Sequence, residues 1–121
     1  CQNSVRFDPM TQQWGNIAAL GYGIQQDAEG RMWLADYQLP GVREIDPETL
    51  ALGKAITLPS GSVKGVSIDF YGYVWVVDMS QSAFRVDPDT DQFLSYDGLN
   101  GPYTYSDMTG WGLSNVTFPQ G

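Results

Sequence analysis

Hydrophobic residues in this chain fall in short runs, which are separated by polar turns rich in Gly, Pro and Asp. Two of the runs, 32–35 and 74–77, are wholly apolar and lack the alternation of a strand that is covered on one face only. A continuous apolar run of this length predicts a strand that is buried on both faces. No stretch keeps the period of an amphipathic helix, so the pattern predicts an all-β chain.

The apolar runs belong to a repeat. Segment 23–36 recurs as 65–78, with Gly, Asp, Gly, Trp and Asp in the same order at an offset of 42 residues. An Asp-Pro-x-Thr block follows each copy, at 46–49 and 87–90, with an offset of 41 residues. A period of about 40–45 residues built from short strands is typical of the blades of a β-propeller.

Turn residues divide each unit into four strands, named a to d in chain order. The turn between a and b contains an Asp that can bond nearby backbone amides and a Gly that supplies a positive φ. The Asp-Pro-x-Thr block forms the turn between c and d, because Pro fixes φ and cannot donate to a strand pair. The expected strands are 22–26, 31–36, one ending at Ile45 and one near 55–58, followed by 73–78, one ending at Val86 and one near 92–96.

Both ends of the chain match only part of a unit. Residues 6–11 match 85–90, so the chain is expected to begin in a strand c and to continue into a strand d near 14–19. Residues 105–110 match 67–72, so strands a and b of a further unit are expected at the other end. The predicted organisation is a half-blade at 1–20, a blade at 21–61, a blade at 62–100 and a half-blade at 101–121.

These units amount to about three blades of four antiparallel strands, whereas propellers close their ring with about four to eight blades. We therefore predict an incomplete ring. Its remaining blades would come either from sequence missing here or from a second copy of the chain, as a homo-oligomer.

Charge and composition exclude some classes of partner. The formal net charge is −8 and the isoelectric point is near 4.1, which argues against a nucleic-acid partner. No apolar run is long enough to predict a membrane span. Cys1 is the one cysteine, so no intrachain disulfide forms. At the first position it fits either the lipid-bearing residue of a mature bacterial lipoprotein or a cut point in a longer chain. We expect an extracellular or periplasmic location.

Segments 65–78 and 85–90 resemble the repeats of streptogramin (virginiamycin B) lyase-type propellers, and NHL and two-component-regulator propeller repeats look similar. The resemblance extends from Val5 to about Gly110 and implies a propeller fold. The lyase family implies a ring that opens a macrocyclic lactone by elimination, with a histidine base and a magnesium ion. This chain contains no histidine, so a lyase-like enzyme would need a catalytic blade that is absent here.

Other polar groups are interpreted structurally, and we predict no catalytic residue, no metal and no cofactor. The acidic run 87–91 resembles a calcium loop, but an EF-hand would need Gly and Glu where Gln92 and Gly98 stand. Asp36 and Asp78 end strand b in both units. They could be paired acids, but their repetition favours a cap on the loop that follows each strand.

The sequence therefore favours a non-enzymatic binding or scaffolding module of an extracytoplasmic β-propeller. The alternatives are a part of a lyase-like enzyme and a half-propeller that closes its ring by homo-oligomerisation. A ligand site is expected where the d–a and b–c loops meet around the central channel, with aromatic rings that stack on a carbohydrate or a small apolar ligand. The same rings could instead cap the ends of the blades. The candidate ligand residues are Tyr22, Tyr37, Lys64, Met79, Gln81 and Tyr103.

Overall fold

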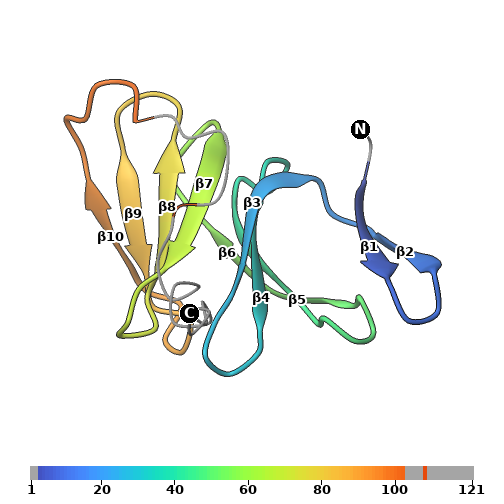
Figure 1. The fold of residues 1–121 in the computed structure, drawn as a ribbon. Coiled ribbons are helices and arrows are strands. Elements are labelled where there is room, and N and C mark those ends of the chain that lie inside the picture. Colours follow the sequence, from blue (N-terminus) through green and yellow to red (C-terminus); the bar gives the residue numbers. More distant parts are fainter. Residues whose placement is uncertain (1–2, 103–107, 109–121) are drawn as a thin grey trace, which may run out of the picture.

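The computed structural model describes residues 3–102 and residue 108. Within these residues the chain contains ten strands and no helix, which confirms the all-β prediction (Figure 1). Apart from 101, 102 and 108, the predicted half-blade at 101–121 lies outside the described residues. The strands are β1 Ser4–Asp8, β2 Gln13–Ile17, β3 Gly21–Gln26, β4 Met32–Asp36, β5 Gly41–Ile45, β6 Leu52–Thr57, β7 Val63–Ile68, β8 Val74–Asp78, β9 Ala83–Val86 and β10 Phe93–Tyr96.

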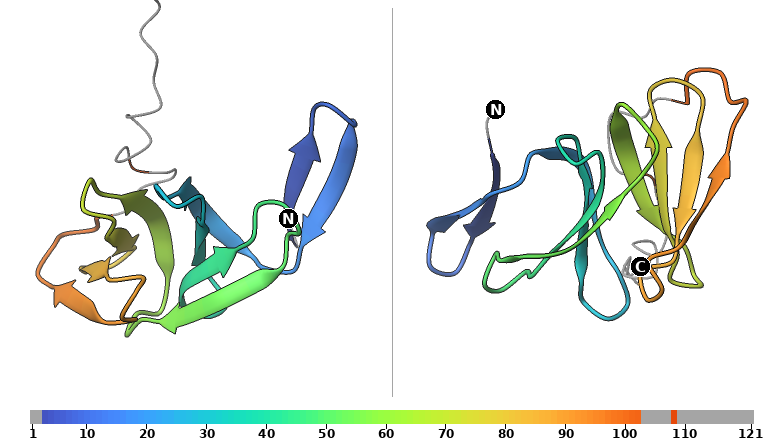
Figure 2. Two further views of the ribbon diagram at one scale, coloured as in Figure 1. Left: turned by 90° about the horizontal axis from the view of Figure 1, so that it is seen from below. Right: turned by 180° about the vertical axis from the view of Figure 1, so that it is seen from behind.

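The strands form three antiparallel sheets in which each strand pairs with its neighbour in sequence. Strands β1 and β2 form a two-stranded sheet, called here the half-blade. Strands β3 to β6 form blade 1 and strands β7 to β10 form blade 2. Figure 2 shows the three sheets side by side in chain order, as an open arc. This arrangement is the one predicted for an incomplete propeller.

The sheets pack face to face through two apolar clusters. The larger cluster lies between the blades and includes Trp33 and Val42 from blade 1 and Val66, Val76 and Phe84 from blade 2, each at most 1% exposed. A smaller cluster joins β2 of the half-blade to β4 and β5 of blade 1. Because each large apolar side chain stabilises the fold by about 1.5–3 kcal/mol when it is buried, these contacts hold the sheets together.

The two wholly apolar runs differ in how well they are covered. In β4, Trp33 packs toward blade 2 and Leu34 packs toward the half-blade, so both faces of the strand are buried as predicted. In β8, Val76 packs against blade 1, but Trp75 on the opposite face is only partly buried. The face of blade 1 that carries Trp33 is covered by blade 2. The corresponding face of blade 2, which carries Trp75, is not covered by any described sheet.

The a–b turn has the predicted construction. Asp27 Oδ1 accepts hydrogen bonds from the amides of Glu29 and Arg31, both at 3.0 Å. Gly30 and its repeat equivalent Gly72 have φ values of 86° and 90°, which L side chains rarely adopt. The carboxylate also has a partner that was not predicted, because Asp27 Oδ2 accepts a bond from the Trp33 indole nitrogen at 2.9 Å.

The c–d turn occurs three times with one geometry. In blade 1, Asp46 Oδ1 accepts bonds from the amides of Glu48 and Thr49, at 2.8 and 2.9 Å. The turn closes through Leu50, whose φ is 64° and whose amide donates to the Asp46 carbonyl at 2.9 Å. The turns that begin at Asp8 and Asp87 repeat these bonds. In all three turns, the backbone amides that bond the aspartate lower its pKa.

Candidate functional site

Four of the six predicted ligand residues occupy two positions of the repeat. Tyr22 and Lys64 are the second residues of β3 and β7. Tyr37 and Met79 directly follow β4 and β8. The Tyr37 amide donates to the Leu20 carbonyl at 3.0 Å, and the Met79 amide donates to the Ser62 carbonyl at 3.2 Å. Leu20 and Ser62 directly precede strand a of the same blade. Each blade thus presents one side chain from the start of strand a beside another from the b–c loop.

Three of these side chains form one cluster that bridges the two blades. The Lys64 ammonium lies 3.2 Å from the centre of the Tyr22 ring and 5.3 Å from the centre of the Tyr37 ring. The rings meet edge to face, with centroids 5.9 Å apart and planes at 80°. Lys64 is only 6% exposed, whereas Tyr22 and Tyr37 are 52% and 44% exposed. The buried cation therefore holds two rings whose other faces reach solvent.

Local backbone geometry directs Tyr22 toward this cluster. The pairing of β3 with β4 shifts register between Gly21 and Ile24, and such an irregularity re-aims the side chains beside it. Gly21 also packs closely against β4, because a Cβ at this position would lie 2.4 Å from the carbonyl oxygen of Ala35. The backbone that carries Tyr22 is therefore pressed directly onto the neighbouring strand.

Asp36 fixes the loop that carries Tyr37. Its Oδ1 accepts bonds from the amides of Gln38 and Leu39, at 2.9 and 3.0 Å. Its Oδ2 accepts a 2.8 Å bond from Nε of Arg43, and the carboxylate is almost fully buried. The predicted capping role is confirmed, and the ion pair with Arg43 adds to it.

Asp78 has the same role in blade 2. Its Oδ1 accepts the amides of Ser80, Gln81 and Ser82, each at 2.9 Å, and its Oδ2 accepts the Ser60 hydroxyl at 3.2 Å. Burial raises the pKa of Asp78, but these hydrogen bonds outweigh it and the pKa is lowered. The group is therefore a carboxylate at neutral pH, held by the loop that it caps.

The other predicted ligand residues do not belong to the cluster of Tyr22, Tyr37 and Lys64. Met79 is 45% exposed in the b–c loop of blade 2. Gln81 follows in the same loop, where its carbonyl accepts the amide of Leu99 at 2.9 Å. Tyr103 lies outside the described residues. The described part of the chain therefore brings together Tyr22, Tyr37 and Lys64 out of the predicted set.

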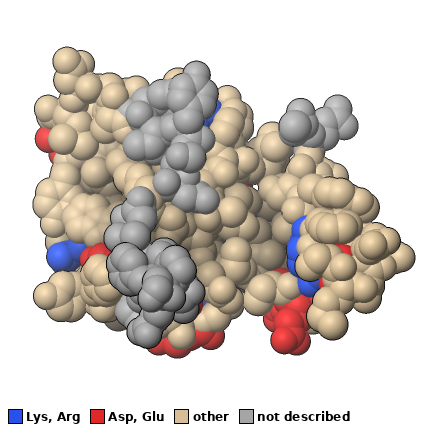
Figure 3. Space-filling view, in the orientation of Figure 1, with Lys and Arg blue, Asp and Glu red and all other residues tan. Residues whose placement is uncertain are grey.

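The cluster and the acidic turns lie at opposite ends of the blades. Strands β3 and β7 run side by side from the end that carries the cluster to the end that carries the a–b turns (Figure 1). Figure 3 shows acidic side chains gathered along the lower edge of this view, at the end of the turns. Lys64 makes no salt bridge within residues 3–102, where its ammonium group contacts the two rings.

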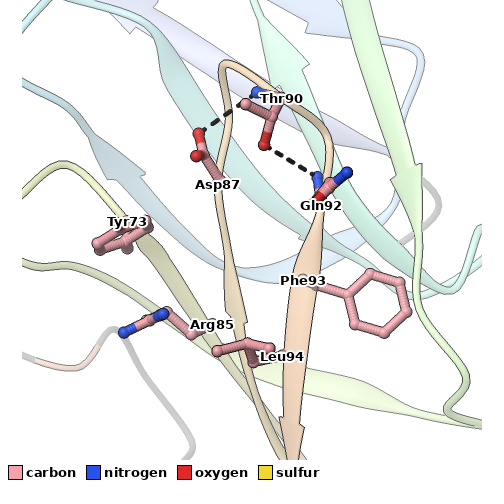
Figure 4. A pocket seen from close by; sticks show the side chains of 7 residues that line it. All are labelled: Tyr73, Arg85, Asp87, Thr90, Gln92, Phe93 and Leu94. Atoms are coloured by element: carbon pink, nitrogen blue, oxygen red, sulfur yellow. Dashed lines mark hydrogen bonds between the residues drawn. The ribbon is translucent and has the colours of Figure 1, made fainter.

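A second group of polar side chains was not predicted from the sequence. A cavity of about 220 Å³ opens on the far face of blade 2 and is lined by Tyr73, Arg85, Asp87, Thr90, Gln92, Phe93 and Leu94 (Figure 4). The Arg85 guanidinium lies 4.5 Å from the centre of the Tyr73 ring. One sequence signal could have identified it, because Arg6 and Arg85 both stand two residues before the Asp of an Asp-Pro turn.

Comparison with known proteins supports the fold. A scan against protein-family models finds no match for the chain. A search of the curated proteins also finds none. Among solved structures, the chain is similar to the extracellular domain of BT4673 from B. thetaiotaomicron, described as a hybrid two-component system. That match has 18% identity, a TM-score of 0.64 and covers 77% of this chain.

A second solved structure, the extracellular domain of BT4673 described as a one-component system, matches with 19% identity and a TM-score of 0.61 over 79% of this chain. The chain spans only 15% and 16% of these two neighbours. Both neighbours are extracellular domains, and at this identity the likeness shows the fold alone. In the described part of the chain there is no helix that could cross a membrane.

Proposed function

We propose that this chain is a non-enzymatic binding module of an extracellular or periplasmic β-propeller, and that Tyr22, Tyr37 and Lys64 form its carbohydrate-binding surface. The observation that carries the proposal is the pair of half-exposed tyrosine rings, held at a fixed angle over a buried ammonium group. The extracellular neighbours support the location.

The geometry of the rings favours a carbohydrate over a wholly apolar ligand. The rings of Tyr22 and Tyr37 stand at 80°, so a ligand that lies flat on one ring meets the edge of the other. A sugar offers C–H groups to the flat face and hydroxyls to the phenols. A wholly apolar ligand would cover the phenol hydroxyls without bonding them, at a cost in free energy.

Lys64 acts as a positioning residue in this proposal. Its ammonium group lies against the Tyr22 ring and is nearly buried, so it fixes the ring that the ligand contacts. A ring that is already fixed loses little conformational entropy on binding, which favours affinity.

The carboxylates beside the cluster support a binding role rather than catalysis. In Asp36 and Asp78, one carboxylate oxygen accepts hydrogen bonds from loop amides, and the other accepts from Arg43 in the first case and from Ser60 in the second. A general acid would instead need a raised pKa, and the pKa of Asp78 is lowered.

The test is to screen the full chain against an array of soluble oligosaccharides and to measure the hits by calorimetry. Tyr22→Ala and Tyr37→Ala should each weaken binding by about tenfold, since each removes one aromatic contact. Tyr71→Ala is the matched control, because Tyr71 is an 89% exposed tyrosine in an a–b turn at the other end of blade 2. The proposal is wrong if no oligosaccharide binds, or if Tyr71→Ala weakens binding as much as the two site variants do.

A further inference from the structure

Both interfaces between sheets contain the same kind of polar contact. A basic side chain of one sheet bonds the carbonyl oxygen of the proline in the c–d turn of the next sheet. Arg6 Nη1 of the half-blade donates to the Pro47 carbonyl of blade 1 at 2.6 Å. Lys54 Nζ of blade 1 donates to the Pro88 carbonyl of blade 2, also at 2.6 Å. The contact therefore recurs at each described junction, from an arginine in one case and from a lysine in the other.

Further bonds tie each turn to the preceding sheet. Arg6 also donates to the Glu48 carbonyl at 2.9 Å. Lys54 pairs with the Asp91 carboxylate at 2.7 Å, and Arg31 pairs with Asp89 at 3.1 Å. The c–d turn thus supplies polar contacts at both described junctions, beside the apolar cluster that forms the core of each.

Arg85 occupies the position in blade 2 that Arg6 occupies in the half-blade, but no hydrogen-bond acceptor for it lies among the described residues. Like Arg6, Arg85 stands two residues before the Asp of its own c–d turn and directly after an apolar residue of strand c. Within residues 3–102 its one recorded contact is the Tyr73 ring, with no hydrogen bond or ion pair. It borders the 220 Å³ cavity in Figure 4, on the face of blade 2 that points away from blade 1.

That face of blade 2 is less covered than the same face of blade 1. On blade 1 it carries Trp33 and Ile56, which are 0% and 5% exposed beneath blade 2. On blade 2 the same positions hold Trp75, which is partly buried, and Tyr96, which is 43% exposed. Their rings stack on each other at 5.6 Å. An occupant must therefore supply both an apolar strand face and a c–d turn.

The half-blade at the other end of the arc supplies both. Its outward face carries Val5, Phe7 and Trp14, which are 52%, 46% and 69% exposed. Its turn has the same bonds at Asp8 as the other two c–d turns have at their aspartates. No side chain of the described residues bonds the carbonyl of Pro9. Among the described residues, the arc thus has a proline carbonyl without a side-chain donor at one end and an arginine without a hydrogen-bond acceptor at the other.

We propose that the open face of blade 2 binds the half-blade of a second copy of this chain, with Arg85 donating to the Pro9 carbonyl of that copy. The contact continues the junction that Arg6 and Lys54 form inside one chain. It joins different surfaces of the two copies, so it is a head-to-tail contact, which closes into a ring or extends into a filament. Two copies supply the strands of a ring within the ordinary range of blade number. This proposal does not depend on carbohydrate binding.

The first experiment is sedimentation velocity of the full chain between about 1 and 100 μM. We expect a species of twice the 13.4 kDa chain mass that dissociates on dilution. Arg85→Glu removes the donor and sets a carboxylate against the turn, and Trp14→Glu charges the opposite surface. Each should weaken assembly by about tenfold to a hundredfold, because a charged hydrogen bond or a buried ring is lost at the contact.

Both positions lie on the surface, and the conservative variants Arg85→Lys and Trp14→Phe serve as matched controls that should still assemble. Circular dichroism checks that every variant retains its strands. The decisive arm mixes Arg85→Glu with Trp14→Glu. Each variant keeps one intact surface, so a head-to-tail contact predicts that the mixture forms a dimer although neither variant does alone.

Each remaining outcome overturns the proposal. A chain that stays monomeric at 100 μM does not bind a second copy, and the open face would then be covered by another blade, from further sequence of the same polypeptide or from a different protein. Assembly that survives both glutamate variants uses other surfaces. Assembly that is lost in both variants and not restored by mixing is symmetric rather than head to tail.

Discussion

The bond between Asp27 and the Trp33 indole makes the a–b turn of blade 1 the most informative place to perturb stability. Asp27→Ala removes the acceptor of the indole N–H, and Trp33 is fully buried, so this donor is left without a partner. An unsatisfied buried donor costs about 1–3 kcal/mol, and each lost turn bond from Glu29 and Arg31 costs about 0.5–1.5 kcal/mol. We expect a loss of about 2–6 kcal/mol, centred near about 4 kcal/mol. This is a large part of the roughly 5–15 kcal/mol that stabilises an ordinary domain.

Asp69→Ala is the internal control, because the repeat places the same turn bonds and indole bond in blade 2. One bond has no equivalent there, since Asp27 also pairs with the Arg31 guanidinium at 2.7 Å and Tyr73 stands at that position in blade 2. Asp69 accepts the amides of Tyr71 and Tyr73 at 2.9 and 3.0 Å and the Trp75 indole at 2.8 Å. Trp75 is only partly buried, so its indole can bond water once the carboxylate is gone. The expected cost is about 1–3 kcal/mol, roughly 2 kcal/mol less than at Asp27.

Urea unfolding followed by tryptophan fluorescence measures both variants. For a slope of about 1–2 kcal/mol per M, the midpoint should fall by roughly 1–2 M more in Asp27→Ala than in Asp69→Ala. Asp27→Asn separates the two effects, since it keeps one oxygen for the turn amides but places an amide group opposite the indole. If Asp27→Ala and Asp69→Ala cost the same, burial of the indole does not set the penalty and the reasoning is refuted.

Three further predictions concern the turns and the strand that carries Tyr22. The lowered pKa values of the three c–d turn aspartates, such as Asp8, mean that their contribution to stability is present above their unfolded pKa and is lost as pH falls through the folded one. The urea midpoint should therefore be steady above about pH 5 and fall below about pH 4; a rise on acidification would contradict this. Gly21→Ala should destabilise the chain by about 1–3 kcal/mol, because its Cβ would meet the Ala35 carbonyl at 2.4 Å. Gly61→Ala, where no atom lies within 4 Å, should leave the melting temperature nearly unchanged, and equal effects of the two would disprove the steric argument. Gln12 has a φ of 57°, so Gln12→Gly should stabilise the chain by up to about 1 kcal/mol. A lower melting temperature of this variant would count against strain at the turn.

The sheets could be predicted from the sequence because strand order and turns are local properties. Asp27, Gly30 and Trp33 recur with their spacing intact, so the period, the a–b turn and the doubly buried strand follow from the chain itself. The Trp33 indole donates to Asp27, six residues earlier in the chain, and the second unit has the same bond at the same spacing. The sequence does not predict this bond, because a turn aspartate already has partners in the nearby amides and its second oxygen could equally face solvent.

Contacts between sheets could not be predicted, because they depend on the rotation and separation of sheets. Tyr22 and Lys64 were predicted as separate loop-end candidates, and nothing in their 42-residue spacing indicates that the ammonium reaches the ring. Arg6 shows the same limit. An arginine near the end of a strand resembles a solvated side chain until the turn of the next sheet is placed beside it, as it is at the Pro47 carbonyl.

The turn contact at each junction has an evolutionary consequence, because its acceptor is a main-chain carbonyl. Arg6 and Lys54 bond the oxygen of Pro47 and of Pro88, atoms that every substitution of those prolines would retain. A duplicated unit would bring a ready acceptor with it, and would need only one basic residue on the preceding sheet at either of two positions. Gain or loss of a whole unit is thus a small genetic step for this architecture. The polar side chains in the loops at the ends of the blades are free to diverge, because the junction does not depend on them.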